Sequence, residues 1–273
     1  MATVAEPISD KASAYGSDRL TRVSFVDRWI YVMMAAFFIV ITLTGFIPDS
    51  LMKIEMVKAG LRPPFPLVLH FHAVLMGSFL LLLMAQTTLM ATGRSDHHQK
   101  LGLASMIIVP ALVVVGFILV PTTYHGVVSQ IQSAPAEVRP ALEDLQLRLD
   151  NIMLLQFRIG ILFPLFIGIA VAARKVDCGL HKRMMILGTA VALPAAIDRI
   201  TWLPHTVPES PVSVDLYVLL VVAPMFLWDV LRHKTIHRAY WIWLAIFALA
   251  AIPVHILWGT PGWHETAHRI MGV

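Results

Sequence analysis

Long apolar runs alternate with short polar segments along almost the whole chain. Seven runs are long enough to cross a bilayer, because a hydrocarbon core of about 30 Å needs about 20 apolar residues of helix. They cover residues 28–48, 67–92, 101–121, 152–173, 183–204, 212–231 and 240–259. Backbone groups in lipid must pair within their own segment, so each run is predicted to be a helix. The pattern predicts an all-α fold, a polytopic membrane bundle of seven transmembrane helices.

The ends of these runs divide the chain into three parts. Residues 1–27 are polar and mixed in charge, without the apolar core of a signal peptide, and predict a cytoplasmic tail. Residues 28–259 form the predicted seven-helix domain, and residues 260–273 form an extracytoplasmic tail. Leucines alternate with charges in residues 134–151, which predicts an amphipathic helix lying at the outer interface.

Two stretches of the chain share a similar pattern. His98 opens the third run and His181 opens the fifth, and Pro110 and Pro194 follow at similar distances. The repetition suggests a duplicated helical hairpin made of runs two and three and runs four and five. Such repeats occur both in transporters and in four-helix haem proteins, so the repeat does not separate these classes. The prolines inside runs predict kinks that neighbouring helices relieve.

Composition supports the membrane location. The chain is 58% hydrophobic and 14% charged, with a mean hydropathy of +0.74, whereas a soluble domain carries about 25% charged residues. The basic residues lie in short clusters between apolar runs, so the formal charge of +4 does not indicate a nucleic-acid partner. The expected partners are the lipid bilayer and other subunits of a membrane complex. Cys178 is the only cysteine, which excludes an intramolecular disulfide and a cysteine-based metal site.

Charge in the loops predicts the orientation. The loops at residues 94–100, 174–183 and 232–238 are basic, and they alternate with segments 122–151 and 205–211, which are neutral or acidic. The positive-inside rule then places the amino terminus in the cytoplasm and the carboxyl terminus outside the inner membrane of a bacterium.

The predicted topology sorts the histidines into two groups. The outer group is His70, His72, His125, His205, His255, His264 and His268, and the inner group is His97, His98, His181, His233 and His237. Histidine is the commonest metal ligand and also binds haem iron axially. His72, His205 and His255 come from three runs at comparable depth, so they are the predicted ligands of haem b or a divalent metal ion. The alternative is that they are interfacial histidines bonded to the outer loops.

Other side chains accompany these predicted ligands. His70 precedes His72 by two positions, about 200° around a helix, so one site does not easily use both. Asp198 and Trp202 share the helical face of His205 in the fifth run. Asp198 is therefore placed to orient a ligand, as carboxylates do around metal sites.

Arg158 lies at a similar depth in the fourth run. Charged residues at this depth are costly unless they are paired, and by default they mark a functional cavity. The predicted partner of Arg158 is Asp198, and the adjacent Arg199 is the alternative partner of that carboxylate. In either case the charges would line the outer pocket, where Arg158 would balance charge or bind an anionic group.

The carboxyl-terminal tail contains His264, Glu265 and His268 in the pattern HExxH. On a helix the two histidines share one face and could bind a metal while Glu265 acts as a base. Thr260 and Pro261 are a good start for such a helix. The alternative is an amphipathic interfacial tail anchored by an aromatic residue, Trp263.

On the inner side, His98 and His181 lie at helix starts beside lysine and arginine. Interfacial basic residues commonly contact lipid phosphates. The alternative is a second redox or proton site, which would need a ligand facing each histidine.

Several motifs together resemble a known group. They are Leu69-His70-Phe71-His72-Ala73-Val74-Leu75-Met76, Gln86, Gly93-Arg94, His98-Gln99-Lys100-Leu101-Gly102, His181-Lys182-Arg183-Met184-Met185 and Ala195-Ala196-Ile197-Asp198-Arg199. Over most of the chain the pattern resembles uncharacterised bacterial seven-helix inner-membrane proteins with H-x-H, H-R-R-L-G-like and H-K-R-L-M-like motifs. The His-Lys-Arg-Met turn is also loosely similar to cytochrome b561-like proteins and to oxidase-assembly membrane proteins. The resemblance implies a bacterial inner-membrane protein and no established activity.

Three classes of function remain open on these grounds. The leading hypothesis is an integral inner-membrane protein with a histidine-lined site near the outer face, which binds haem b or a metal ion for electron transfer or oxidoreduction. The alternatives are a small-molecule or proton-coupled transporter or binding protein, and a non-catalytic accessory subunit of a membrane complex.

Overall fold

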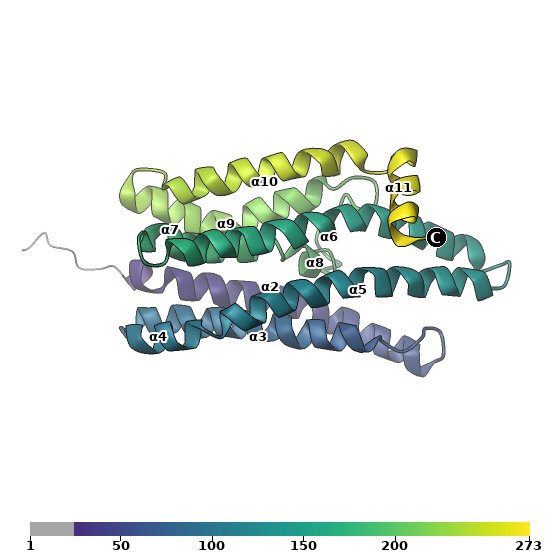
Figure 1. The fold of residues 1–273 in the computed structure, drawn as a ribbon, viewed down its shortest axis with the longest axis horizontal. Coiled ribbons are helices and arrows are strands. Elements are labelled where there is room, and N and C mark those ends of the chain that lie inside the picture. Colours follow the sequence, from purple (N-terminus) through teal and green to yellow (C-terminus); the bar gives the residue numbers. More distant parts are fainter. Residues whose placement is uncertain (1–24) are drawn as a thin grey trace, which may run out of the picture.

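A computed structural model describes residues 25–273, and this part of the chain is built from helices joined by short loops (Figure 1). Its helices are α2 (Phe25–Lys58), α3 (Leu67–Ala91), α4 (Ser95–Gly102), α5 (Ser105–Ser133), α6 (Arg139–Ala173), α7 (Cys178–Ala190), α8 (Pro194–Ile197), α9 (Val212–His233), α10 (Arg238–Leu257) and α11 (Pro261–Met271). The predicted amino-terminal tail lies outside the described residues except for 25–27, which begin α2.

Within residues 25–273, six helical segments are long and apolar enough to cross a membrane. They are α2, α3, the α4–α5 segment Ser95–Ser133, α6, α9 and α10. Their exposed side chains are largely aliphatic and aromatic, as in a surface that contacts lipid. The described residues 25–273 are therefore all-helical, and the chain is a multi-pass membrane protein.

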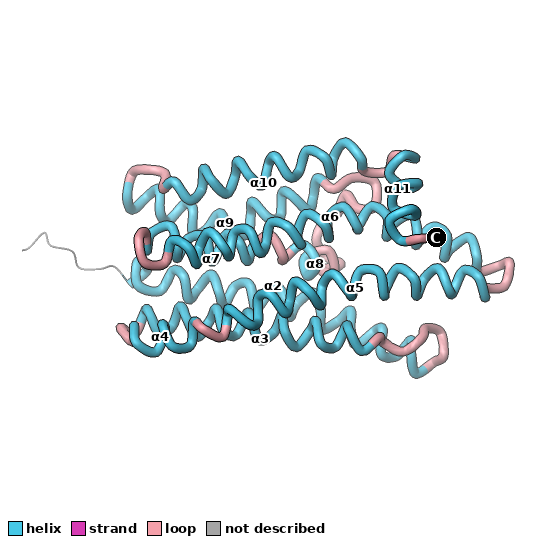
Figure 2. Tube along the Cα trace, in the orientation of Figure 1, coloured by secondary structure: helices cyan, strands magenta, loops and turns pink. Residues whose placement is uncertain are grey.

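The predicted fifth span, residues 183–204, is not one continuous helix. α7 ends at Ala190, three residues turn, and α8 covers only Pro194–Ile197 before the chain leaves helical geometry. Pro194 has no N–H for the Ala190 carbonyl, and its ring crowds that carbonyl. Leu193 donates to Ala190 instead, at 3.1 Å. Figure 2 shows α8 flanked by loop midway along the bundle, so the predictions of seven continuous spans and of a duplicated hairpin are not confirmed.

The predicted interfacial helix at residues 134–151 is also different in the structure. Most of this segment is helical, but it belongs to α6, which runs without interruption from Arg139 to Ala173. The helix continues through Pro164, as α5, α9 and α10 continue through their own prolines. The amphipathic segment therefore extends the fourth span beyond the apolar part of the bundle.

The bundle has two chemically distinct ends. The loops that join α3 to α4, α6 to α7 and α9 to α10 lie at one end, which we call the basic end because the three predicted basic loops meet there. α2 begins at the basic end, and the carboxyl terminus lies near the opposite end, which we call the far end (Figure 1).

The core between the helices is apolar and filled by large side chains. Phe38, Phe79 and Phe166 are fully buried there, with Met184 and Met225. α2 crosses α8 so closely that a Cβ added to Gly45 would lie 2.0 Å from the Ala196 carbonyl oxygen. The broken segment is thus held against the first span by backbone contact.

Candidate functional site

The three predicted outer ligands do not come together. His72 lies on α3 and His255 on α10, and these helices lie on opposite sides of the bundle (Figure 1). His205 lies in the loop between α8 and α9. Each imidazole has its own surroundings. The Nδ1 atom of His72 is buried and has no hydrogen-bond partner among the described residues, whereas the other two imidazoles contact different carboxylates.

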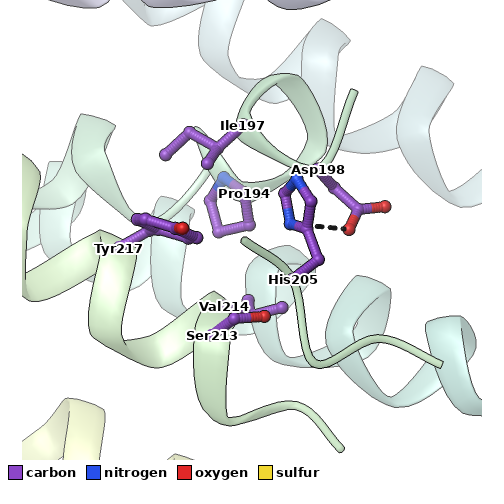
Figure 3. A pocket seen from close by; sticks show the side chains of 7 residues that line it. All are labelled: Pro194, Ile197, Asp198, His205, Ser213, Val214 and Tyr217. Atoms are coloured by element: carbon purple, nitrogen blue, oxygen red, sulfur yellow. Dashed lines mark ion pairs between the residues drawn. The ribbon is translucent and has the colours of Figure 1, made fainter. Parts of the chain in front are cut away.

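His205 faces Asp198 across a small pocket (Figure 3). The His205 Nδ1 atom lies 3.7 Å from the Asp198 carboxylate, and its Nε2 atom lies 3.2 Å from the Ile200 carbonyl. The cavity volume is about 10 Å³, far less than the 300–1,000 Å³ of typical ligand sites. His205 and Asp198 are therefore neighbours, as predicted, although they lie in a loop and not on one face of a helix.

The other residues predicted around this pocket point elsewhere. Trp202 is 74% exposed. Arg199 pairs with Asp49 of α2 at 3.2 Å and lies over the Phe46 ring. His70 is exposed and contacts the Phe65 ring edge-on. These three residues therefore do not complete a site with His205.

Arg158 pairs with Asp215 of α9 and not with Asp198, so the predicted partner was wrong. The Arg158 Nη2 and Asp215 Oδ1 atoms are 2.6 Å apart, and the arginine side chain is 4% exposed. His255 of α10 binds the second carboxylate oxygen of Asp215, Oδ2, at 2.7 Å. The Phe247 ring covers the guanidinium at 5.1 Å. Three membrane helices thus supply a network of an arginine, an aspartate and a histidine, which we call the outer triad (Arg158, Asp215, His255).

The HExxH motif forms part of a different cluster. His264 and His268 share a face of α11, as predicted, and both face the fully buried Asp150 of α6, at 2.9 and 3.4 Å from its Oδ2 atom. The Tyr124 hydroxyl donates to the Asp150 Oδ1 atom at 2.7 Å. Glu265 points away and pairs with Arg269 on the exposed side. The glutamate is therefore not placed beside the two histidines as a base would be.

α11 is attached to the bundle by its aromatic residue. Thr260 caps the helix by accepting from the Trp263 N–H, in agreement with the predicted helix start. Trp263 is buried, and its indole N–H donates to the Asp150 carbonyl at 2.7 Å. This residue holds the tail against α6, which corrects the predicted role of a lipid anchor.

A second buried ion pair lies near the basic end. The Arg183 Nε and Nη2 atoms donate to both Asp229 oxygens, at 2.6 and 2.9 Å. The Tyr240 hydroxyl also donates to Asp229, at 2.6 Å, and Arg183 Nη1 donates to the Gly179 carbonyl at 3.1 Å. All the polar groups of this pair have partners, as a buried ion pair requires.

The rings of His98 and His181 lie in edge-to-face contact at the basic end. Their ring centroids are 6.3 Å apart and their planes are nearly perpendicular, at 81°. His98 comes from α4 and His181 from α7. Each of these two histidines is therefore the neighbouring ligand that an inner site at the other histidine would need.

A backbone carbonyl orients each of these rings. The His181 Nδ1 atom lies 2.8 Å from the Ala170 carbonyl, and the His98 Nδ1 atom lies 3.3 Å from the Gln86 carbonyl. A carbonyl can only accept, so each Nδ1 atom carries the proton and each Nε2 atom keeps its lone pair. Neither Nε2 atom has a hydrogen-bond partner among residues 25–273. The side-chain oxygen of Gln86 is also buried without a partner.

The loops beside this pair are charged. Asp177 caps α7 by accepting from the Leu180 N–H, and this bond together with the Arg238 guanidinium lowers the pKa of Asp177 from its ordinary value. Partial burial lowers the pKa of His237, and the charge of Arg183 lowers it further. The carboxylate and the neutral imidazole are thus the favoured forms at this end.

Sequence reasoning missed the carboxylates that organise these networks. Asp215 and Asp229 lie inside the apolar run of α9, and Asp150 lies two residues before the run at 152–173. An aspartate in such a position signals a buried partner, because an unpaired charge in lipid is costly. Within residues 25–273, no group of three His, Cys, Asp or Glu side chains has an arrangement that could hold a metal ion.

Fold and composition define the class as a multi-pass membrane protein whose described part is a helical bundle with paired polar groups inside it. No family model matches the chain, and neither the curated proteins nor the solved structures yield a match.

Proposed function

We propose that this protein is a membrane electron-transfer protein that holds a haem b between His98 and His181. The proposal keeps the cofactor and the reaction class suggested by the histidine content, and it moves the site from the far end to the basic end. The observation that carries it is the close approach of two imidazole rings whose Nε2 atoms have no hydrogen-bond partner among residues 25–273.

The spacing of the rings suits one shared metal ion. A metal–imidazole bond is about 2.0–2.1 Å, and the ring centroid lies about 1.1 Å behind its nitrogen, so two opposed imidazoles on one ion have centroids about 6.3 Å apart. The observed separation is 6.3 Å. Edge-to-face packing without a metal ion allows ring-centroid separations anywhere from about 4.5 to 7 Å.

The surroundings of each ring also fit a metal ligand. Ligating histidines usually donate their other N–H to a carbonyl or carboxylate, which fixes the tautomer and the ring orientation. Ala170 and Gln86 provide these carbonyls. Two protein ligands suit haem iron in particular, because the porphyrin supplies the four remaining positions, and bound haem would supply one-electron chemistry.

The first test is the optical spectrum of protein produced in haem-sufficient bacteria and purified in detergent. We expect a Soret band and, after reduction, the sharp visible bands of low-spin b-type haem, with about one haem per chain by haemochrome assay. His98→Ala and His181→Ala should each remove most of the bound haem. His97→Ala is the matched control, because His97 is the exposed neighbour of His98 on the same helix.

Three outcomes would overturn the proposal. One is wild-type protein without haem, and another is a His181→Ala protein that keeps the wild-type spectrum. The third is a different metal, detected by elemental analysis in stoichiometric amount and lost with either histidine, which would keep the ligands but exclude haem.

A further inference from the structure

α9 carries two aspartates, the partly exposed Asp215 and the buried Asp229, that pair with arginines in different ways. Asp215 and Asp229 lie nearly four helical turns apart, about 21 Å at 1.5 Å per residue. Asp229 makes two hydrogen bonds to Arg183 and a third to Tyr240. Asp215 approaches Arg158 at 2.6 Å, but without the geometry of a hydrogen bond. The two pairs provide an internal comparison within one helix.

The difference leaves Arg158 with unused hydrogen-bonding capacity. Its side chain is only 4% exposed, and its buried Nη1 atom has no hydrogen-bond partner in the described part of the chain. A buried donor without an acceptor is costly, and more so when it is charged. Arg183 shows that the same bundle can satisfy a buried guanidinium completely, since Gly179 accepts from the corresponding nitrogen. The orphan donor of Arg158 therefore indicates that an acceptor from outside the chain binds there.

The depth of Arg158 strengthens this inference. It lies about 22 Å along α6 from the basic end, well inside a hydrocarbon core of about 30 Å. Ionisable residues at such depth usually serve a substrate or ion pathway. His255 provides the connection to the surface, because its side chain is 38% exposed while the Asp215 side chain is 16% exposed.

We propose that the outer triad is a binding site for a small organic carboxylate, held by Arg158 and reached past His255. A guanidinium matches the planar oxygens of a carboxylate. A monoanion suits this depth better than a dianion, because the cost of burying charge grows steeply with charge. The Phe247 ring beside the guanidinium provides an apolar contact for a short hydrocarbon tail. This site is separate from the His98–His181 pair and does not depend on haem.

The probe for this site is acetate, and the measurement is saturation-transfer NMR of its methyl signal on purified protein. We expect a saturable signal with wild type and none with acetamide, which has the same shape without the charge. The double variant Arg158→Gln/Asp215→Asn removes both charges together, so no unpaired charge stays buried, and it should lose the acetate signal. Arg148→Gln is the matched control, since Arg148 is an exposed arginine of the same helix.

Asp215→Asn gives a second and opposite expectation. It frees the Arg158 charge from its internal partner, so acetate should bind at least several-fold more tightly than to wild type. The proposal is overturned if wild type gives no saturable signal, which would mean that water alone satisfies Arg158. It is also overturned if acetamide binds equally or the double variant binds like wild type. The haem spectrum of each variant should match wild type, so this test fails or succeeds independently of the haem test.

Discussion

At the scale of single residues, the molecule is organised by charges inside an apolar bundle. Asp150, Arg158, Arg183 and Asp229 are all buried, and each meets a partner on another helix. Such groups stabilise the fold only when they are paired, because removing one partner leaves an uncompensated charge in a low dielectric. The pairs therefore determine which helices lie together as well as what chemistry the bundle can perform.

The Arg183–Asp229 pair is expected to dominate stability near the basic end. Asp229→Asn removes the charge that faces Arg183 and weakens three hydrogen bonds, so it should cost about 3–5 kcal/mol. The measurement is the free energy of unfolding in mixed micelles. Asp144→Asn is the control, because Asp144 forms an exposed pair with Arg148 and should change stability by less than about 1 kcal/mol. Equal costs for the two variants would contradict the structural role of the buried pair.

The residue scale is also where sequence reasoning is weakest. Histidine content and the free-energy cost of burying a charge identify which residues are candidates for a site, and they single out Arg158, His205 and Asp198. The partners cannot be found by the same means, because pairing depends on helix rotation and depth, which no local pattern encodes. Packing between segments far apart in the chain therefore brings Arg158 next to Asp215 and His98 next to His181.

At the scale of elements, the apolar runs predict the helices well and their continuity less well. Six of the predicted spans correspond to helical segments that can cross a membrane. The fifth predicted span ends early because Pro194 interrupts the hydrogen bonding at Ala190. Two charged residues, Asp198 and Arg199, follow the end of α8 directly. In a bundle a proline can kink a helix or end it, and the surrounding contacts decide which occurs.

The contact between α2 and α8 provides a test of this element. Gly45→Ala would place a Cβ 2.0 Å from the Ala196 carbonyl oxygen, and backbone cannot move aside as a flexible side chain can. We expect α8 to be displaced and the protein to lose about 1–3 kcal/mol of stability. Gly77→Ala on α3 is the matched control, because its Cβ would meet nothing within 4 Å. Thermal unfolding of both variants in detergent makes the comparison, and a neutral Gly45→Ala would contradict the close crossing.

At the scale of the whole molecule, the bundle places two candidate sites at different depths. The His98–His181 pair lies at the basic end, where the three predicted basic loops meet, and the outer triad lies toward the far end. We propose that the basic end faces the cytoplasm of a bacterial cell, since lysine and arginine are retained on that side of the inner membrane. A haem at the basic end would then exchange electrons with cytoplasmic partners.

The single cysteine allows a direct test of this orientation. Cys178 is exposed and begins α7 at the basic end. A maleimide that cannot cross membranes should label inverted membrane vesicles and leave intact cells unlabelled. Cys178→Ser removes the reactive group and is the blank, while a permeant maleimide should label both preparations. Labelling of intact cells by the impermeant reagent would reverse the proposed orientation.

The central claim is that two nearly perpendicular imidazoles hold one haem iron. Electron paramagnetic resonance of the oxidised protein tests this most directly, because two axial imidazoles make ferric haem low-spin and crossed ring planes make its signal strongly anisotropic. With ring planes 81° apart, we predict that strongly anisotropic low-spin signal for wild type and its loss in His98→Ala and in His181→Ala. A high-spin signal from wild type, or a low-spin signal that survives either substitution, would contradict the account.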